Sequence, residues 1–135
     1  VLLVDKIRKE LPGVKIVALP GASALTTALS ASGITSAVFT FYGFLPHKKG
    51  RETIFKKIAE NKETSVFYES VHRIEKTLAA LAKTLPAKRT VAIARELTKI
   101  HEEVVRGTAE EVKEYFHTNK DKVRGEFVVI VEGRG

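Results

Sequence analysis

Charged side chains directly follow two apolar stretches of this chain, and they are the groups that could do chemistry. Residues 91–94 (VAIA) are apolar throughout, and residues 95–103 then carry both signs of charge on Arg95, Glu96, Lys99, His101, Glu102 and Glu103. Residues 65–68 (SVFY) are followed in the same way by Glu69, His72 and Arg73. Because open α/β sheets bind ligands at the carboxyl ends of their strands, two such endings favour a binding site. The alternative for residues 95–103 is a solvated hairpin that only connects two strands.

These residues do not by themselves specify a reaction. A general base could come from any of four glutamates, although such groups are often simply paired with nearby cations: Glu69, Glu96, Glu102 and Glu103. The chain has no phosphate-binding P-loop, no nucleophile elbow and no pair of histidines at metal-binding helical spacing. It also has no cysteine, which excludes disulfides, thiolate catalysis and cysteine zinc sites. We therefore expect no metal site.

A third candidate is the basic segment at residues 47–62. The chain carries 23 Lys and Arg against 16 Asp and Glu, a net charge of +7. In this segment only Glu52 and Glu60 oppose six cations: Lys48, Lys49, Arg51, Lys56, Lys57 and Lys62. Such a local excess fits a polyanionic partner, whose phosphates bind cations and release counterions. Many basic proteins nevertheless bind no nucleic acid, so the segment could also be a solvated surface.

The elements that must position these groups alternate between helix and strand. Periodicity and turn residues predict helices at residues 2–11, 23–32, 52–61 and 71–85, and a last helix that Thr108 and Glu111 cap. Apolar runs predict strands at residues 14–19, 37–44, 64–68, 91–94 and 125–131, with one more after His101. This order predicts one layered α/β domain. Its sheet should be mixed, mostly parallel with some antiparallel pairing, with helices on both faces.

Two features concern the beginning of the chain. The predicted strand at residues 14–19 leads through Pro20-Gly21 into a helix, where free backbone N–H groups could meet an anion or a cofactor carboxylate. The alternative is an ordinary connection in which Ser23 caps the helix. The chain contains no methionine, not even an initiator, which favours a piece of a longer protein. No apolar run is long enough to span a membrane, and no signal-peptide pattern is present.

Five motifs, taken together, resemble a known family. They are LPGASALTTALSASG, FYGFLPHKKGR, VFYESVHRIEKTL, VAIARELTKIHEEVVRGT and RGEFVVIVEG. In this order and spacing the chain is similar to the bacterial small-subunit ribosomal RNA cytidine 2′-O-methyltransferase family of the tetrapyrrole methylase superfamily. Ala22 and Val71 stand where prolines are common. The resemblance implies the second, carboxy-terminal domain of a two-domain enzyme over residues 1–135, with an inter-domain helix and first strand at residues 1–19 and the amino-terminal domain absent.

The same resemblance implies a cofactor, S-adenosyl-L-methionine, in the cleft between the two domains. Ser23 and Ala24 would lie beside its methionine portion. The adenosine side and the end of the pocket would be lined by Tyr68, Glu69, Ala94, Arg95, Glu126 and Phe127. The cluster Lys48, Lys49, Arg51, Lys56 and Lys57 would hold phosphates of ribosomal RNA.

The implied reaction is methyl transfer from a sulfonium to a ribose hydroxyl, which needs alignment and removal of the hydroxyl proton. Glu96, His101 or Glu102 could be the base, and nothing in the sequence selects among them. One alternative is a tetrapyrrole C-methyltransferase domain, since that substrate is also polyanionic. Another is a non-catalytic RNA-binding module. We further expect a cytoplasmic protein that does not bind membranes and that forms a homodimer at full length.

Overall fold

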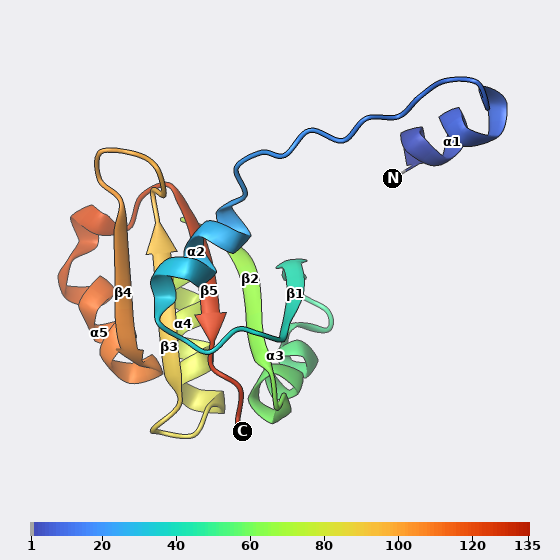
Figure 1. Cartoon of the computed structure of the whole chain (residues 1–135). Coiled ribbons are helices and arrows are strands. Elements are labelled where there is room, and N and C mark those ends of the chain that lie inside the picture. The colour runs from blue at the N-terminus through green and yellow to red at the C-terminus, as the bar shows by residue number, and fades with distance from the viewer. Residues whose placement is uncertain (1) are drawn as a thin grey trace.

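The computed structural model describes residues 2–135, which form a five-stranded sheet covered by helices and a projecting amino-terminal arm (Figure 1). The helices are α1 (Leu2–Glu10), α2 (Ala24–Ser32), α3 (Arg51–Glu60), α4 (Ile74–Thr84), α5 (Ala109–Thr118) and the short 3₁₀ helix η1 (Lys120–Lys122). The strands are β1 (Phe39–Phe44), β2 (Thr64–Ser70), β3 (Thr90–Arg95), β4 (Glu103–Thr108) and β5 (Glu126–Val131). The layered α/β domain predicted from the sequence is confirmed.

The sheet has the order β1-β2-β5-β3-β4, and β5 is central. It is mixed, as predicted, but the expectation that it is mostly parallel is wrong. Only β1 and β2 pair in parallel, whereas β2–β5, β5–β3 and β3–β4 pair antiparallel. The short connection between β3 and β4 forces a hairpin, which must be antiparallel. β5 enters the sheet from the edge at which β2 and β3 end, and therefore runs against both neighbours.

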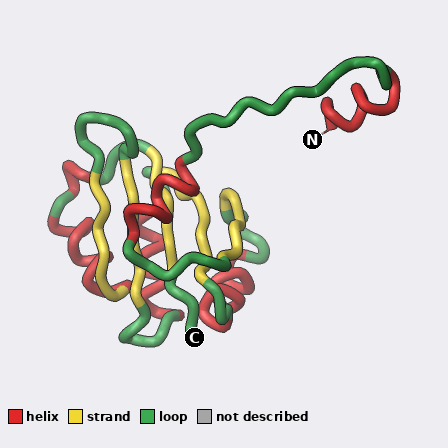
Figure 2. Tube along the Cα trace, viewed as in Figure 1, coloured by secondary structure: helices red, strands yellow, loops and turns green. Residues whose placement is uncertain are grey.

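Helices cover both faces of the sheet, which confirms that prediction (Figure 2). On one face α2 packs Ala28 and Leu29 against β2, β3 and β5. On the other face α3, α4 and α5 bury a larger core, which includes the predicted stripe of Ile74, Leu78 and Leu81 in α4 and Leu85 directly after it. Burial of such apolar surface is the main favourable term in folding. The core thus holds the sheet rigidly beneath its polar strand ends.

The predicted capping box of α5 is present in full. The backbone N–H of Glu111 donates to Thr108 Oγ1 at 3.2 Å, and the backbone N–H of Thr108 donates to Glu111 Oε2 at 2.7 Å. Two N–H groups that the helix itself leaves unpaired are satisfied in this way. The cap ends β4 and starts α5 without an intervening loop.

The amino-terminal arm differs from the prediction in one element. The predicted first helix is present as α1, but residues 14–19 form no strand and run as an extended segment away from the sheet (Figure 1). A strand needs a hydrogen-bonded neighbour, and within residues 2–135 none pairs with this segment. Its apolar side chains stay in solvent, with Val17 63% and Leu19 87% exposed.

No helix in residues 2–135 has the length and apolar character needed to cross a bilayer.

Candidate functional site

The two charged strand endings lie together at one edge of the sheet. β1, β2 and β3 end there, and β4 and β5 begin there, at the upper edge in Figure 1. Across this edge Glu69 is opposite Phe127, Phe127 is opposite Arg95, and Arg95 is opposite Glu103. Only β5 separates the two endings, which therefore lie close together at one edge of the sheet.

The edge has two sides, because alternate residues of a strand point to opposite faces. Glu69, Arg95 and Glu103 contact residues of the α3–α5 face, whereas Tyr68 and Ala94 pack on the α2 face. The predicted cofactor residues are therefore divided between the two faces. The sequence alone does not predict this division, because the face to which each side chain points depends on the exact residue at which its strand ends.

An apolar hollow of about 280 Å³ opens on the α2 side of the edge. It is lined by Ala24, Phe44, Tyr68, Glu69, Glu126 and Phe127, five of which were predicted to bind the cofactor. The ring of Tyr68 lies edge-on to Phe41, with 5.0 Å between centroids, and tilted to Phe44 at 5.5 Å. Phe44 is 61% exposed, so an aromatic surface faces solvent here. Such a surface can stack with a flat heteroaromatic ring.

The remaining predicted cofactor residues lie outside the hollow. Ser23 is the N-cap residue of α2 but makes no side-chain capping hydrogen bond. Ala94 is fully buried in the α2-side core. Arg95 lines a different, polar pocket on the other side of the edge.

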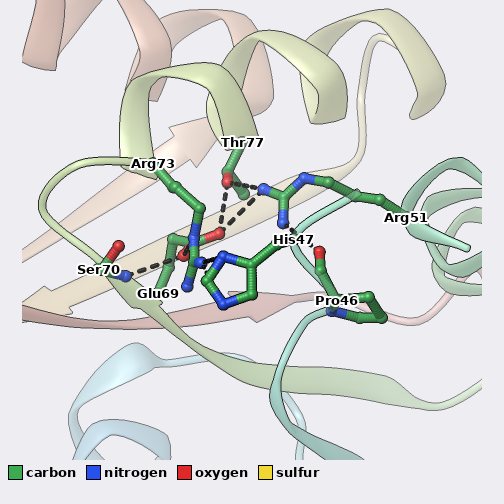
Figure 3. A network of polar contacts seen from close by, with 7 residues as sticks. All are labelled: Pro46, His47, Arg51, Glu69, Ser70, Arg73 and Thr77. Carbon is green, nitrogen blue, oxygen red and sulfur yellow. Dashed lines mark hydrogen bonds and ion pairs between the residues drawn. The ribbon is translucent and has the colours of Figure 1, made fainter. Parts of the chain in front are cut away.

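The carboxylate of Glu69 is the centre of a buried polar network (Figure 3). Its side chain has no exposed surface, Arg73 Nε donates to its Oε1 at 2.8 Å, and Arg51 Nη2 donates to its Oε2 at 3.0 Å. Thr77 Oγ1 donates to Oε2 at 2.7 Å, and the backbone N–H of Ser70 donates to Oε1 at 2.9 Å. Glu69 lines the hollow, but its carboxylate is already engaged by these four groups of the protein.

The protonation of Glu69 follows from this network. Burial raises the pKa of the carboxyl, but the hydrogen bonds from Thr77, Arg73, Arg51 and Ser70 together lower it below its ordinary value. Glu69 is therefore an anion that holds two arginines rather than a free general base. One of them, Arg51, also donates to the carbonyl oxygen of Pro46 at 3.1 Å, and the other, Arg73, lies against the ring of His47.

The five residues of the basic cluster therefore differ: Arg51 is paired inside the protein, whereas the four lysines face solvent. The side chain of Arg51 is only 16% exposed, and its guanidinium is held by Glu69, Thr77 and Pro46. The four lysines of the cluster are exposed to solvent: Lys48, Lys49, Lys56 and Lys57. Arg51 thus anchors the loop that carries Lys48 and Lys49 instead of presenting its own charge.

A polar pocket of about 240 Å³ lies on the other side of the edge, under the β3–β4 hairpin. It is lined by Arg95, Glu96, His101, Asp121, Lys122 and Arg124. Arg95, Glu96 and His101 are among the residues predicted from the sequence, whereas Asp121, Lys122 and Arg124 are not. The run KDKVRG directly before β5 carries three cations against one carboxylate, which could have indicated them. What the sequence could not show is that η1 folds this run against the hairpin.

Glu103 joins the hairpin to α5 and η1. Its carboxylate accepts from Arg95 Nε at 2.8 Å and from Lys122 Nζ at 2.8 Å, and also from the hydroxyl of Tyr115. Burial raises the pKa of Glu103, but the hydrogen bonds from Lys122, Tyr115 and Arg95 outweigh it and lower the pKa to about 2. Glu103 therefore stays ionised at neutral pH and is no candidate base.

The hairpin loop has an unusual backbone. Glu96 and Thr98 have φ angles of 49° and 67°, in the left-handed region that a β-branched residue rarely adopts. The loop is held by Glu102, whose Oε2 accepts from the backbone N–H of Thr98 at 2.6 Å, and by Lys99, whose Nζ donates to Glu96 Oε1 at 3.1 Å. Conformations of this kind persist where the surroundings enforce them and are frequent in functional loops.

The three candidate bases, Glu96, His101 and Glu102, differ in their hydrogen-bond partners and in whether they line the polar pocket. The carboxylate of Glu102 has a backbone partner, and it does not line the polar pocket. Glu96 and His101 both line that pocket. Glu96 also lines a smaller hollow beside Ala24 and Glu126, so it borders both sides of the edge.

Comparison with known proteins supports a specific family. The family model described as tetrapyrrole (corrin/porphyrin) methylases matches residues 1–113. The ribosomal RNA small subunit methyltransferase I of Pasteurella multocida is 46% identical over 123 residues, 90% of this chain and 44% of that protein. The protein of the same name from Bacillus subtilis is 47% identical over 119 residues, 87% of this chain and 40% of that protein. The chain thus spans less than half the length of these relatives.

Solved structures show the same fold at low sequence identity. A cobalt precorrin-4 methyltransferase of cobalamin biosynthesis aligns over 97% of this chain and 57% of its own, with a TM-score of 0.67 and 15% identity. A uroporphyrin-III C-methyltransferase from Thermus thermophilus, in complex with S-adenosylhomocysteine, aligns over 96% and 57%, with a TM-score of 0.56 and 19% identity. With the family model matching most of its length, the chain belongs to the tetrapyrrole (corrin/porphyrin) methylases.

Proposed function

We propose that this chain is the carboxy-terminal domain of an S-adenosyl-L-methionine-dependent enzyme that methylates a ribose 2′-hydroxyl of small-subunit ribosomal RNA. The observation that carries the proposal is the identity of 46% and 47%, over about nine tenths of the chain, to two ribosomal RNA small subunit methyltransferases I. Tetrapyrrole methylation is less favoured, because the structures with such names share only 15–19% identity with this chain.

The apolar hollow on the α2 side fits part of the cofactor. Its aromatic lining offers a face on which an adenine ring can stack, and Glu126 at its rim can accept from a ribose hydroxyl. Ser23 and Ala24, at the amino terminus of α2, would lie beside the charged methionine portion, where free helix N–H groups favour a carboxylate. We retain Ala94 only as buried support and Glu69 only as the anchor of the neighbouring loop. Bound in this place, the cofactor supplies an activated methyl group.

The residues of the hairpin fit the second requirement, removal of the hydroxyl proton. Transfer of the methyl group to the ribose oxygen would release the hydroxyl proton, which a base at hydrogen-bond distance would have to accept. Glu96 fits this role better than Glu102, since it borders both hollows and its other partner is an exposed lysine. His101 is the second candidate, because it lines the polar pocket.

The test uses the protein as the cell makes it, small-subunit ribosomal RNA and a methyl-labelled donor. We expect label in the RNA, mapped to one 2′-oxygen by resistance of the following phosphodiester to alkali, and none in uroporphyrinogen. Replacing Tyr68 by Ala should raise the KM for the donor about tenfold, equivalent to ~1.4 kcal/mol of lost binding. The control is Tyr42→Ala, at an aromatic residue outside the hollow. Label in the tetrapyrrole alone would contradict the proposal.

Two further expectations concern the whole protein. We propose that it is a homodimer, which sedimentation equilibrium of the purified protein tests. We also propose a cytoplasmic location, in keeping with ribosomal RNA as the substrate. Fractionation that places the protein in a membrane or outside the cell would contradict this second expectation.

A further inference from the structure

The polar pocket contains a buried arginine whose terminal N–H groups have no protein partner. The side chain of Arg95 is only 8% exposed, yet within residues 2–135 its single hydrogen bond is from Nε to Glu103. Its two terminal nitrogens, which carry four donors, are thus left for a ligand. Neither nitrogen is a fully buried unpaired donor; both are reached by solvent in the pocket and are free to donate to an acceptor that binds there.

The other charges of the pocket favour an anion. Lys122 and Arg124 line it together with Arg95. Glu96 is paired with Lys99, so these three cations face two carboxylates, Asp121 in the lining and Glu103 behind it. Glu103 accepts from both Arg95 and Lys122, which fixes the two cations side by side. The pocket therefore keeps a net positive charge, and Glu103 holds two of its cations, Arg95 and Lys122, in place.

We propose that this pocket binds a backbone phosphate of the RNA, and that Arg95, Lys122 and Arg124 are its binding residues. The proposal rests on the function proposed above and adds the part of the substrate that this pocket takes. A guanidinium with two free terminal nitrogens matches two oxygens of one phosphate. His101, which also lines the pocket, can donate a further N–H to the same group.

The position of the pocket favours a polyanion over a small anion. The pocket lies at the β3–β4 end of the sheet edge, while Lys48 and Lys49 follow β1 at the opposite end. Three spacings between strands separate β1 from β3, which is about 14 Å. A chain of several nucleotides can contact both ends at once, whereas a single free phosphate or a small carboxylate cannot. The RNA would then be held at the polar pocket near the β3–β4 hairpin and at the basic loop after β1, with the apolar hollow between these two contacts.

The test is a titration of the isotope-labelled 135-residue chain, followed through its backbone amide resonances. The probes are the dinucleoside monophosphate cytidylyl-cytidine, inorganic phosphate and citrate, each at constant ionic strength. We expect cytidylyl-cytidine to shift amides of residues 95–103 and 121–125. The variant Arg124→Gln should raise its dissociation constant at least about fivefold, because one phosphate contact is lost. The control Arg134→Gln removes the same charge at the other end of β5 and should change it less than about twofold.

A second variant addresses the buried arginine without removing its charge. Arg95→Lys retains a cation for Glu103 but loses the two-pronged geometry, so binding should weaken about threefold or more while the domain stays folded. Equal effects of Arg124→Gln and Arg134→Gln would overturn the proposal, as would binding of citrate or inorganic phosphate without binding of the dinucleotide. No methyl donor is present in this titration. Failure of methyl transfer would therefore contradict the proposed function and leave this result unaffected.

Discussion

Glu69 and Arg51 are joined by a buried ion pair of 3.0 Å that connects the end of β2 to the start of α3. The pair links two candidate regions: Glu69 belongs to the strand edge, and Arg51 ends the basic loop. Arg51 also donates to the carbonyl oxygen of Pro46, so the loop at residues 47–50 is fixed at both of its ends. The loop is thus fixed relative to the hollow by an interaction of residues 18 positions apart.

Replacing Glu69 by Ala should destabilise the domain strongly. The change leaves Arg51 and Arg73 without their buried partner, and removing one member of a buried pair costs about 3–5 kcal/mol. Urea unfolding followed by circular dichroism measures this loss. The matched control is Glu75→Ala, which breaks an exposed pair with Lys120 and should cost less than about 1 kcal/mol. Equal losses for the two variants would show that the network adds nothing to stability.

The exposed lysines of the basic loop should act on RNA through their charge alone. Replacing Lys48 and Lys49 by Gln removes two phosphate contacts, so the slope of log K against log salt should fall by roughly 1.4 for single-stranded RNA. Fluorescence anisotropy at several salt concentrations gives this slope. The control is the pair Lys83→Gln and Lys88→Gln, at exposed positions before β3 on the opposite edge of the sheet. An unchanged slope in the first variant would identify the loop as a solvated surface.

Acid should destabilise the domain through Glu103. Its pKa is about 2 in the folded chain against 4.5 ordinarily, so its stabilising effect is complete above pH 4.5 and is lost as the pH falls towards 2. The loss is on the order of 3 kcal/mol. Unfolding free energies at pH 6 and pH 2.5 should therefore differ less in Glu103→Gln than in the unchanged chain. The same pH dependence in both proteins would contradict this origin.

Gly125 allows the carboxylate of Glu96 to lie against the start of β5. It has a φ of 75°, and a Cβ there would lie 1.7 Å from Glu96 Oε1. Gly125→Ala should thus cost about 1–2 kcal/mol and displace Glu96 from Lys99. Thermal unfolding measures the loss. In the double variant with Glu96→Ala only the backbone strain remains, so the two changes should cost less than the sum of their separate effects. Strict additivity would show that the two residues do not interact.

Much of the fold follows from local sequence signals. The stripe Ile74, Leu78, Leu81 and Leu85 predicted α4, and the capping pair Thr108 and Glu111 predicted the start of α5; both are confirmed. Both patterns involve residues close together in the sequence, whose spacing alone determines which side chains meet on a helix. The strand at residues 14–19 failed for the opposite reason. Its pattern was apolar, but a strand exists only when a second strand pairs with it.

The candidate site divides in the same way. The sequence determined that polar groups follow β2 and β3, because an apolar strand followed by charges is visible along the chain. Only the tertiary structure decided that the carboxylate of Glu69 is consumed by Arg51 and Arg73, and that Lys122 and Arg124 join Arg95. Charge and residue type are properties of the sequence. Which charge neutralises which, and which donors remain free, depends on contacts between residues far apart in the chain, and these exist only once the sheet and its helices have packed.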